Sequence, residues 1–199
     1  LQESKIDTLP DSKLKSFLPQ QLDQVFSLPA VGFAGGTISA INSASFQVVS
    51  YSHLTFSFHP NPTINCVRQH IAITNIYAPS SRSLKQAFLN ELSSISQPED
   101  TPWIIAGDFN LIRFPSEKNN SHFDARQAAK FNSLNKFLAL HELHLSDRLS
   151  MWTSWQDNPI LALLDRAFFD NRWNTAIPDS TLYSLPRTTS DHVPLMISL

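Results

Sequence analysis

Apolar and polar residues alternate in two stretches in the first third of the chain, over residues 37–41 and 46–58. Both stretches are rich in β-branched and aromatic residues, which is the composition and period typical of β-strands. The sequence His-Pro-Asn-Pro at residues 59–62 predicts a turn, and residues 69–77 predict a further strand that ends before Pro79. This part of the chain is therefore expected to be a run of strands.

The period changes to that of an amphipathic helix at residues 83–95, where one helical face collects Leu84, Phe88, Leu92 and Ile95. Pro98 ends this helix. A second helix is predicted after Asp124, which suits the N-cap position because its carboxylate can accept a hydrogen bond from a free backbone N–H. The apolar stripe of this second helix consists of Ala128, Phe131, Leu134 and Leu138.

Further short apolar runs predict strands, and they lie at residues 103–106, 161–169, 182–185 and 193–199. Strands outnumber helices and follow one another in hairpin-like order, so we expect an α/β architecture of two packed sheets flanked by helices. The chain has no internal repeat and no low-complexity linker. Its 199 residues are most economically a single domain over residues 1–199.

The composition describes a soluble globular protein, with 42% hydrophobic and 16% charged residues. A net charge of −2 gives no general affinity for polyanions, so contact with nucleic acid would require a local basic patch. The single cysteine, Cys66, excludes an internal disulfide and fits a reducing compartment, so we expect an intracellular location with the nucleus as one candidate. No apolar run approaches the ~20 residues that span a bilayer, so no membrane association is expected. We expect a monomer.

Two short sequences carry the candidate chemistry. They are Gly-Asp-Phe-Asn at residues 107–110 and Ser-Asp-His-Val-Pro at residues 190–194. Each puts a carboxylate beside a group that can bind or protonate a phosphate, and each adjoins a strand-like run. Strand ends can hold oxygen ligands for a divalent metal and an imidazole for proton transfer. Metal-assisted cleavage of a phosphate ester is therefore the first hypothesis.

An ordered set of such sequences extends along the chain: Gln-Glu at 2–3, Asn-Ile-Tyr-Ala-Pro at 75–79, Gly-Asp-Phe-Asn at 107–110, Leu-Asp-Arg at 164–166 and Ser-Asp-His at 190–192. This order resembles the endonuclease/exonuclease/phosphatase superfamily. More closely, it is similar to the endonuclease domain of plant LINE-type non-LTR retrotransposons, over essentially the whole chain. The sequence Leu-Pro-Arg-Thr-Thr-Ser-Asp-His-Val-Pro-Leu at 185–195 is the most specific match. The resemblance implies a deoxyribonuclease-like four-layer α/β sandwich with its site at one rim of two stacked sheets.

The resemblance also implies roles for individual residues. Glu3 matches the metal-binding Glu and Asp191 a second carboxylate on the metal side, which suits Mg²⁺ or Mn²⁺ because both prefer oxygen ligands. Tyr77 matches a Tyr that helps to hold the scissile phosphate. Asp108 matches the Asp that orients or deprotonates the attacking water, and Asn110 matches its phosphate-binding companion. Residues i and i+2 of a strand point to the same side, so both are expected to face one phosphate.

Asp165 matches the Asp that orients the imidazole and fixes its tautomer. His192 would stabilise charge on the phosphoryl oxygens as imidazolium, or transfer a proton. A metal, a positioned water and an imidazole suffice to hydrolyse a phosphodiester. The resemblance therefore implies an endonuclease that nicks DNA and leaves a 3′-hydroxyl.

The chain departs from the family pattern in several places. The family has an earlier strand with an Asn that contacts metal and phosphate, and this sequence begins after it. Met151 stands where a phosphate-contacting Thr is usual, Ser154 replaces an Asn, and Leu163 occupies a basic position. Methionine cannot replace the lost hydroxyl donor. A degenerate copy of low or no activity is therefore one alternative reading.

Three alternatives for function stay open at this level. They are a DNA endonuclease, a phosphatase or phosphodiesterase of the same fold with a smaller substrate, and a catalytically silent domain that keeps the fold and some DNA binding. Each site residue also has a structural alternative. Asp108 and Asn110 could form a simple turn, Asp165 could belong to a structural ion pair, and Glu3 could be a solvated carboxylate near a terminus.

Overall fold

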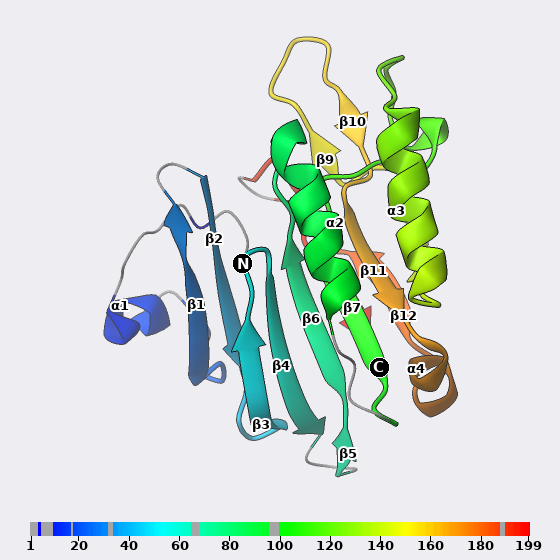
Figure 1. The fold of residues 1–199 in the computed structure, drawn as a ribbon. Helices are drawn as coiled ribbons and strands as arrows, with labels where there is room; N and C mark the ends of the chain where they lie inside the picture. Colours follow the sequence, from blue (N-terminus) through cyan, green and yellow to red (C-terminus); the bar gives the residue numbers. More distant parts are fainter. Residues whose placement is uncertain are drawn as a thin grey trace.

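The computed structural model of the chain describes residues 4, 10–16, 18–31, 34–64, 68–95, 100–187 and 190–199. A mixed sheet crosses the centre of the molecule, with helices lying against it (Figure 1). The strands are β1 Gln24–Val31, β2 Ala34–Ile41, β3 Phe46–His53, β4 Ser57–Ile64, β5 Gln69–His70, β6 Ala72–Tyr77, β7 Trp103–Asp108, β8 His141–Leu143, β9 Trp152–Thr153, β10 Leu161–Ala162, β11 Asp165–Phe169, β12 Thr181–Ser184 and β13 Leu195–Ser198. The α-helices are α1 Asp11–Ser16, α2 Lys85–Ser94, α3 Ala125–Phe137 and α4 Asn171–Ala176, and the 3₁₀ turns are η1 Arg82–Leu84 and η2 Pro115–Glu117.

The central sheet has the strand order β3-β4-β6-β7-β11-β8, and β5 pairs with β4. Strands β6 and β7 are parallel, while the other neighbours in this sheet are antiparallel. The parallel pair is joined through α2, as a crossover connection requires. The C-terminal ends of β6 and β7 therefore lie side by side at the same end of the sheet.

Each face of the central sheet carries its own core, because side chains alternate along β7. Trp103 and Ile105 point into a cluster with Phe88 of α2 and Phe131 of α3. Ile104 points to the opposite face, where it belongs to a second cluster that Ile197 of β13 packs against. Helices α2 and α3 thus cover one face, and the β12–β13 pair lies on the other, behind the central sheet in Figure 1.

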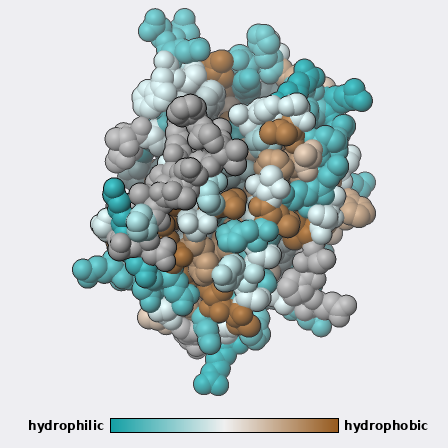
Figure 2. Space-filling view, turned by 60° about the vertical axis from the view of Figure 1, so that its left-hand side comes forward, coloured by the Kyte–Doolittle hydropathy of each residue, from teal (hydrophilic) through white to brown (hydrophobic). Residues whose placement is uncertain are grey.

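Strands β1 and β2 form a separate antiparallel hairpin beside the central sheet. Its contacts with the sheet include a row of tilted rings, with Phe26 of β1 against Tyr51 and Phe58. Seen from the side that carries this hairpin, apolar residues reach the surface in several patches among polar ones (Figure 2).

The two predicted helices are confirmed as α2 and α3. Asp124 is the N-cap of α3, and its carboxylate accepts a 3.0 Å hydrogen bond from the Gln127 backbone N–H. The strand predicted over residues 46–58 is wrong in extent, because the chain turns between β3 and β4.

None of the helices in the described part of the chain is long and apolar enough to span a membrane.

The turn predicted at residues 59–62 is also wrong, since these residues belong to β4. Pro60 and Pro62 are two positions apart, so their missing N–H groups fall on the same side of the strand. The partner strand β3 has a register irregularity between Val48 and Ser50, opposite this segment. Prolines are tolerated at such irregularities because the ladder is already interrupted there.

Candidate active site

The strand register places three predicted site residues in a row across the central sheet. Asp108, the last residue of β7, pairs with Tyr77 at the end of β6 and with Asp165 at the start of β11. Side chains of directly paired residues point to the same face, with Cβ atoms about 5 Å apart. Residues far apart in sequence are therefore neighbours here, on the face that is turned toward β13.

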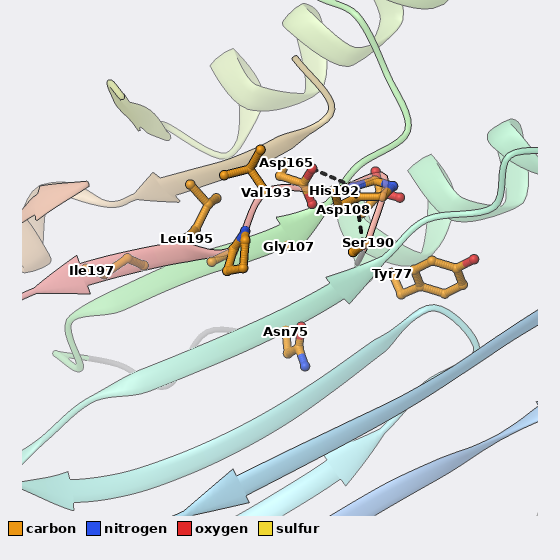
Figure 3. Close-up of a pocket in the computed structure, with 12 residues that line it drawn as sticks. Asn75, Tyr77, Gly107, Asp108, Asp165, Ser190, His192, Val193, Leu195 and Ile197 are labelled. Carbon is orange, nitrogen blue, oxygen red and sulfur yellow. Dashed lines mark hydrogen bonds and ion pairs between the residues drawn. The ribbon is translucent and has the colours of Figure 1, made fainter. Parts of the chain in front are cut away.

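His192 reaches this row from the segment before β13. That segment is fixed by backbone hydrogen bonds, from Val193 N–H to the Met151 carbonyl at 2.9 Å and from Thr153 N–H to the Asp191 carbonyl at 3.1 Å. The His192 ring then lies beside Asp165, with Nδ1 of the ring 2.7 Å from Oδ2 of the carboxylate (Figure 3). The structure thus brings Asp165 and His192 into direct contact.

Asp165 forms no ion pair with its neighbour Arg166. Arg166 has a fully buried side chain and binds the carboxylates of Glu117 and Glu142. This network holds the beginning of β11 without using Asp165. The Asp165 carboxylate is left for His192.

Asp108 is fixed by the turn that follows β7. The backbone N–H of Asn110 donates to Oδ1 of Asp108 at 2.7 Å, and its side-chain Nδ2 donates to Oδ2 at 2.6 Å. The same Nδ2 reaches the Ala78 carbonyl at 2.9 Å. Asn110 has a φ of 49°, in the left-handed region. The expectation that residues 108 and 110 both lie on a strand, with their side chains on the same side, is therefore wrong, because β7 ends at Asp108 and the chain turns.

The turn has a local physical cause. Asn is among the residues that adopt the left-handed conformation most readily, since its short amide can bond to nearby backbone or side-chain groups. Phe109, between the two polar residues, is fully buried in the core under α2 and α3. A buried anchor flanked by Asp and Asn thus places both polar side chains at the sheet edge.

The surroundings of the cluster change the proton affinities of its members. Asp108 is only 2% exposed, and burial, together with the negative charge of Asp165, raises its pKa to about 7. Burial alone would lower the pKa of His192. The hydrogen bond and charge of Asp165, with the charges of Asp108 and Asp191, instead raise it to about 9. At neutral pH the imidazole is therefore charged, and Asp108 is close to its midpoint.

The cluster lies at one end of a pocket of about 480 Å³ between β6, β7 and the segment from Ser190 to Ile197. Its lining comprises Asn75, Tyr77, Ala106, Gly107, Asp108, Asp165, Ser190, His192, Val193, Pro194, Leu195 and Ile197. Figure 3 shows Val193, Leu195 and Ile197 on one side and the ionisable groups on the other. The pocket thus has one end lined by ionisable side chains and another lined by apolar ones.

The sequence of residues 7–192 matches the Endonuclease/Exonuclease/phosphatase family. The chain belongs to this family. Members of the Endonuclease/Exonuclease/phosphatase family are hydrolases that act on phosphoester bonds. A comparison with curated protein sequences gives no match.

Solved structures with the same fold include nucleic-acid enzymes. The endonuclease domain of TRAS1, a telomere-specific non-LTR retrotransposon, is 16% identical with a TM-score of 0.69, covering 88% of this chain and 79% of that one. An AP endonuclease from Archaeoglobus fulgidus is 13% identical with a TM-score of 0.68, covering 99% and 86%. TDP2 from D. rerio, complexed with a single-strand DNA product, is 14% identical with a TM-score of 0.61, covering 95% and 81%. These similarities establish a shared fold.

Enzymes of this family typically use divalent metal ions. Carboxylate oxygens of the kind present at the pocket suit such ions. Among the described residues, however, no group of three or more His, Cys, Asp or Glu side chains is arranged to hold a metal. Of the two predicted ligands, Asp191 accepts a 3.0 Å hydrogen bond from the Trp152 indole on its Oδ2, and Glu3 lies outside the described residues.

Met151 takes no direct part in the pocket. Its side chain is 1% exposed, while its backbone pairs with Val193 and Ala162. The position where a phosphate-contacting hydroxyl was expected is therefore filled by a core side chain. Met151 therefore packs in the core and offers no hydroxyl donor, at a position where the family resemblance gives a Thr.

The sequence argument missed two residues at the site. Ser190 lines the pocket, and its Oγ accepts a 3.0 Å hydrogen bond from the His192 backbone N–H. Lys85 is buried at the beginning of α2 and donates to the Asn110 carbonyl. A signal for Lys85 was present in the sequence. The buried residues of α2 are Lys85, Phe88, Leu89 and Leu92, which follow helical spacing, while the predicted Leu84 is exposed.

Proposed function

We propose that this protein is a divalent-metal-dependent endonuclease that hydrolyses a DNA phosphodiester, in the manner of a retrotransposon target-site nuclease. The observation that carries the proposal is the convergence of Asp108, Asp165 and His192 at one end of a pocket. A positioned carboxylate and an oriented imidazole are the groups that phosphodiester hydrolysis requires. The family match supports the reaction class.

The proposed chemistry follows from the charges of these groups. Asp108, with a pKa of about 7, accepts or directs the proton of the attacking water. His192, with a pKa of about 9, carries a positive charge that stabilises the developing charge on the phosphoryl oxygens. Asp165 holds the ring in position through Nδ1. Water adds to phosphorus, and the bond to the 3′-oxygen breaks to leave a 3′-hydroxyl.

We further propose that Glu3 and Asp191 hold Mg²⁺ or Mn²⁺, which when bound would neutralise charge on the phosphate. Carboxylates are suitable donors for either ion. The Trp152 indole donates its hydrogen bond to Oδ2 of Asp191. This bond leaves Oδ1 of the same carboxylate unused. Tyr77, which pairs with Asp108 across the sheet, would bind the scissile phosphate. Asn110 would join it only by giving up one of the two hydrogen bonds that its Nδ2 donates, to Asp108 and to the Ala78 carbonyl.

An exposed aromatic–cation pair, Trp155 with Arg187, favours DNA as the substrate. Trp155 lies on the loop between β9 and β10 and is 72% exposed. The guanidinium of Arg187 lies 5.6 Å from the centre of its ring. An exposed aromatic ring beside a cation can stack on a base while the cation meets the backbone phosphate. A structure of the same fold contains a single-strand DNA product, which agrees with this choice.

The four-layer arrangement is part of the same proposal. Within the described part of the chain, β13 pairs only with β12, and β2 pairs only with β1. The Ser4 backbone N–H bonds to the Gly36 carbonyl of β2 at 3.0 Å, so the chain enters beside β2. We propose that the β1–β2 and β12–β13 pairs are parts of one second sheet stacked on the central sheet.

The test is nicking of supercoiled plasmid in Mg²⁺. The expected result is conversion to open circles that bear 3′-hydroxyl ends. His192→Ala should slow nicking at least ~100-fold, whereas His122→Ala, at an exposed position, should not. Absence of nicking by the wild-type protein would remove the enzyme proposal. Equal rates for wild type and His192→Ala would remove the mechanism.

A catalytically silent domain is the second candidate, and the buried Met151 favours it. Such a domain would retain DNA without cutting it, and retention would weaken steeply as salt rises. A phosphatase of the same fold would instead release phosphate from small monoesters and leave plasmid intact. The same protein preparations, tested for retention and for phosphate release, separate these readings from the nuclease.

A further inference from the structure

Lys85 is a cation in an unfavourable place. It is the first residue of α2, is 7% exposed, and belongs to the helical face that packs on the sheet. Burial lowers its pKa to about 8, although the nearby negative charge of Asp108 opposes this effect. A positive charge at a helix N-terminus is also opposed by the helix dipole. A residue held at such a cost points to a specific task.

The contact of Lys85 identifies that task. Its Nζ donates a 2.6 Å hydrogen bond to the backbone carbonyl of Asn110. Asn110 is the left-handed residue of the turn after β7, with a φ of 49°. The N–H and side-chain amide of the same residue hold both carboxylate oxygens of Asp108. Lys85 therefore binds the carbonyl of the same residue whose N–H and side-chain amide fix Asp108.

Other bonds fix the rest of this turn, so that Lys85 completes it. The Phe109 N–H donates to the Leu164 carbonyl at 3.0 Å, and the Ala78 N–H donates to the Asp108 carbonyl at 2.8 Å. Asn adopts the left-handed conformation more readily than other non-glycine residues, and the contacts of Asn110 hold it in that conformation here. Rotation of the Asn110–Leu111 peptide would change ψ of Asn110 and loosen the turn whose N–H and side-chain amide hold Asp108.

We propose that Lys85 is a positioning residue of this site, which clamps the Asn110 carbonyl and so holds the turn that presents Asp108 and Asn110. Its positive charge also favours the ionised form of the Asp108 carboxyl. Lys85 acts through Asn110 and touches no substrate. The structural part of the inference is independent of the reaction, while its effect on rate rests on the proposed function.

The variants separate the hydrogen bond from the charge. Lys85→Met keeps the apolar stem of the side chain and removes both the donor and the charge. Lys85→Gln keeps an N–H donor without the charge, and it also serves if Lys85→Met fails to fold. Lys136→Met is the matched control, because Lys136 is an exposed lysine in the last turn of α3.

The first readout needs no activity. In metal-free protein, ¹³C and ¹⁵N NMR follow titration of the Asp108 carboxyl and the amide signals of Asn110. In Lys85→Met the carboxyl should titrate about one pH unit higher than in wild type, and the Asn110 signals should move. In Lys85→Gln the carboxyl should titrate higher while the Asn110 signals stay near wild type. An unchanged carboxyl midpoint and unchanged Asn110 signals in both variants would overturn the proposal.

The second readout is the kinetics of plasmid nicking in Mg²⁺. Loss of positioning should lower kcat roughly 10-fold in Lys85→Met with little change in KM, and Lys136→Met should match wild type. An equal kcat in wild type and Lys85→Met would contradict the positioning role. If wild type itself does not nick, the proposed function fails, and the NMR titration still decides whether Lys85 holds the turn.

Discussion

Neighbouring ionisable groups in the pocket differ in charge because their surroundings differ. Asp108 is buried beside another carboxylate, so its neutral form is favoured, whereas the carboxylates around His192 favour the imidazolium. Pairs of groups whose proton affinities are driven apart are typical of acid–base sites. Single residues in this chain therefore acquire their chemistry from partners that the strand register brings to them.

The acid limb of the activity profile follows from Asp108. Its pKa is about 7, above the usual value for Asp, so protonation removes the reactive carboxylate as pH falls below 7. Initial nicking rates should drop about tenfold per pH unit between pH 6.5 and 5. Asp108→Asn should be slow at every pH, with no such limb. A wild-type rate that stays flat down to pH 5.5 would contradict the role of Asp108.

The sequence predicted the identity of several site residues better than their geometry. Asp165 and His192 were paired by family resemblance, and the 2.7 Å contact agrees with this pairing. Asn110 was expected on a strand, but its backbone is left-handed. Its carbonyl accepts a hydrogen bond from the side chain of Lys85, 25 residues earlier in the sequence. Such a long-range contact leaves no mark in local periodicity. It could not have been found from residues 107–110 alone.

Helix α2 is attached to the sheet by polar anchors as well as by its apolar face. Near its C-terminal end, Glu91 accepts hydrogen bonds from the Thr55 and Phe56 N–H groups and from the Ser57 hydroxyl. The Ser57 proton is thus used, so Ser57 accepts from Nε2 of His59, 2.8 Å away. Burial lowers the pKa of His59 to about 4, so the ring is neutral at pH 7 and its bare Nδ1 accepts from the Thr74 hydroxyl, 2.9 Å away.

This buried imidazole should make stability depend on pH. Burial, and to a smaller extent the charge of His53, lowers the pKa of His59 from 6.5 to about 4. In the unfolded chain His59 takes up a proton as the pH falls through 6.5, whereas in the folded chain it does so only near pH 4. The stability that depends on the neutral ring is therefore fully present above pH 6.5. It is lost progressively as pH falls to 4, by up to about 3 kcal/mol.

Urea unfolding of wild type and His59→Gln measures the effect. The difference in unfolding free energy between the two proteins should shrink as pH falls from 6.5 to 4. His122→Gln, at an exposed histidine, should run parallel to wild type over the same range. A constant difference between wild type and His59→Gln would show that His59 takes up its proton without loss of stability.

At the level of elements, period and capping residues predicted both long helices, because each buries one face on the sheet. The strand limits were less predictable. Pro60 and Pro62 indicate a turn by local preference, yet pairing with β3 and β6 keeps this segment extended. Short elements such as β9 and α4 were not predicted, since they consist of few residues and depend on their tertiary partners.

For the whole molecule, the sheet topology is what makes a site from distant residues. The parallel pair β6–β7 ends at one edge, β11 starts at that edge, and the segment before β13 is bonded to the strand that contains Trp152. The order of short sequences along the chain indicated this convergence only through resemblance to a family. Composition and periodicity predicted an α/β domain, but they could not supply the register that aligns Tyr77, Asp108 and Asp165.

The central claim is that Asp165 and His192 act as one unit at the edge that also holds Asp108. A double-mutant cycle of plasmid nicking rates with Asp165→Asn, His192→Ala and the double variant tests it most directly. Each single change should slow nicking. At a pH well above 7, where Asp108 is ionised with or without the charge of Asp165, the double variant should be no slower than His192→Ala, because Asp165 then acts through the imidazole. Losses that multiply in the double variant would show that the two residues act independently, and would contradict this account.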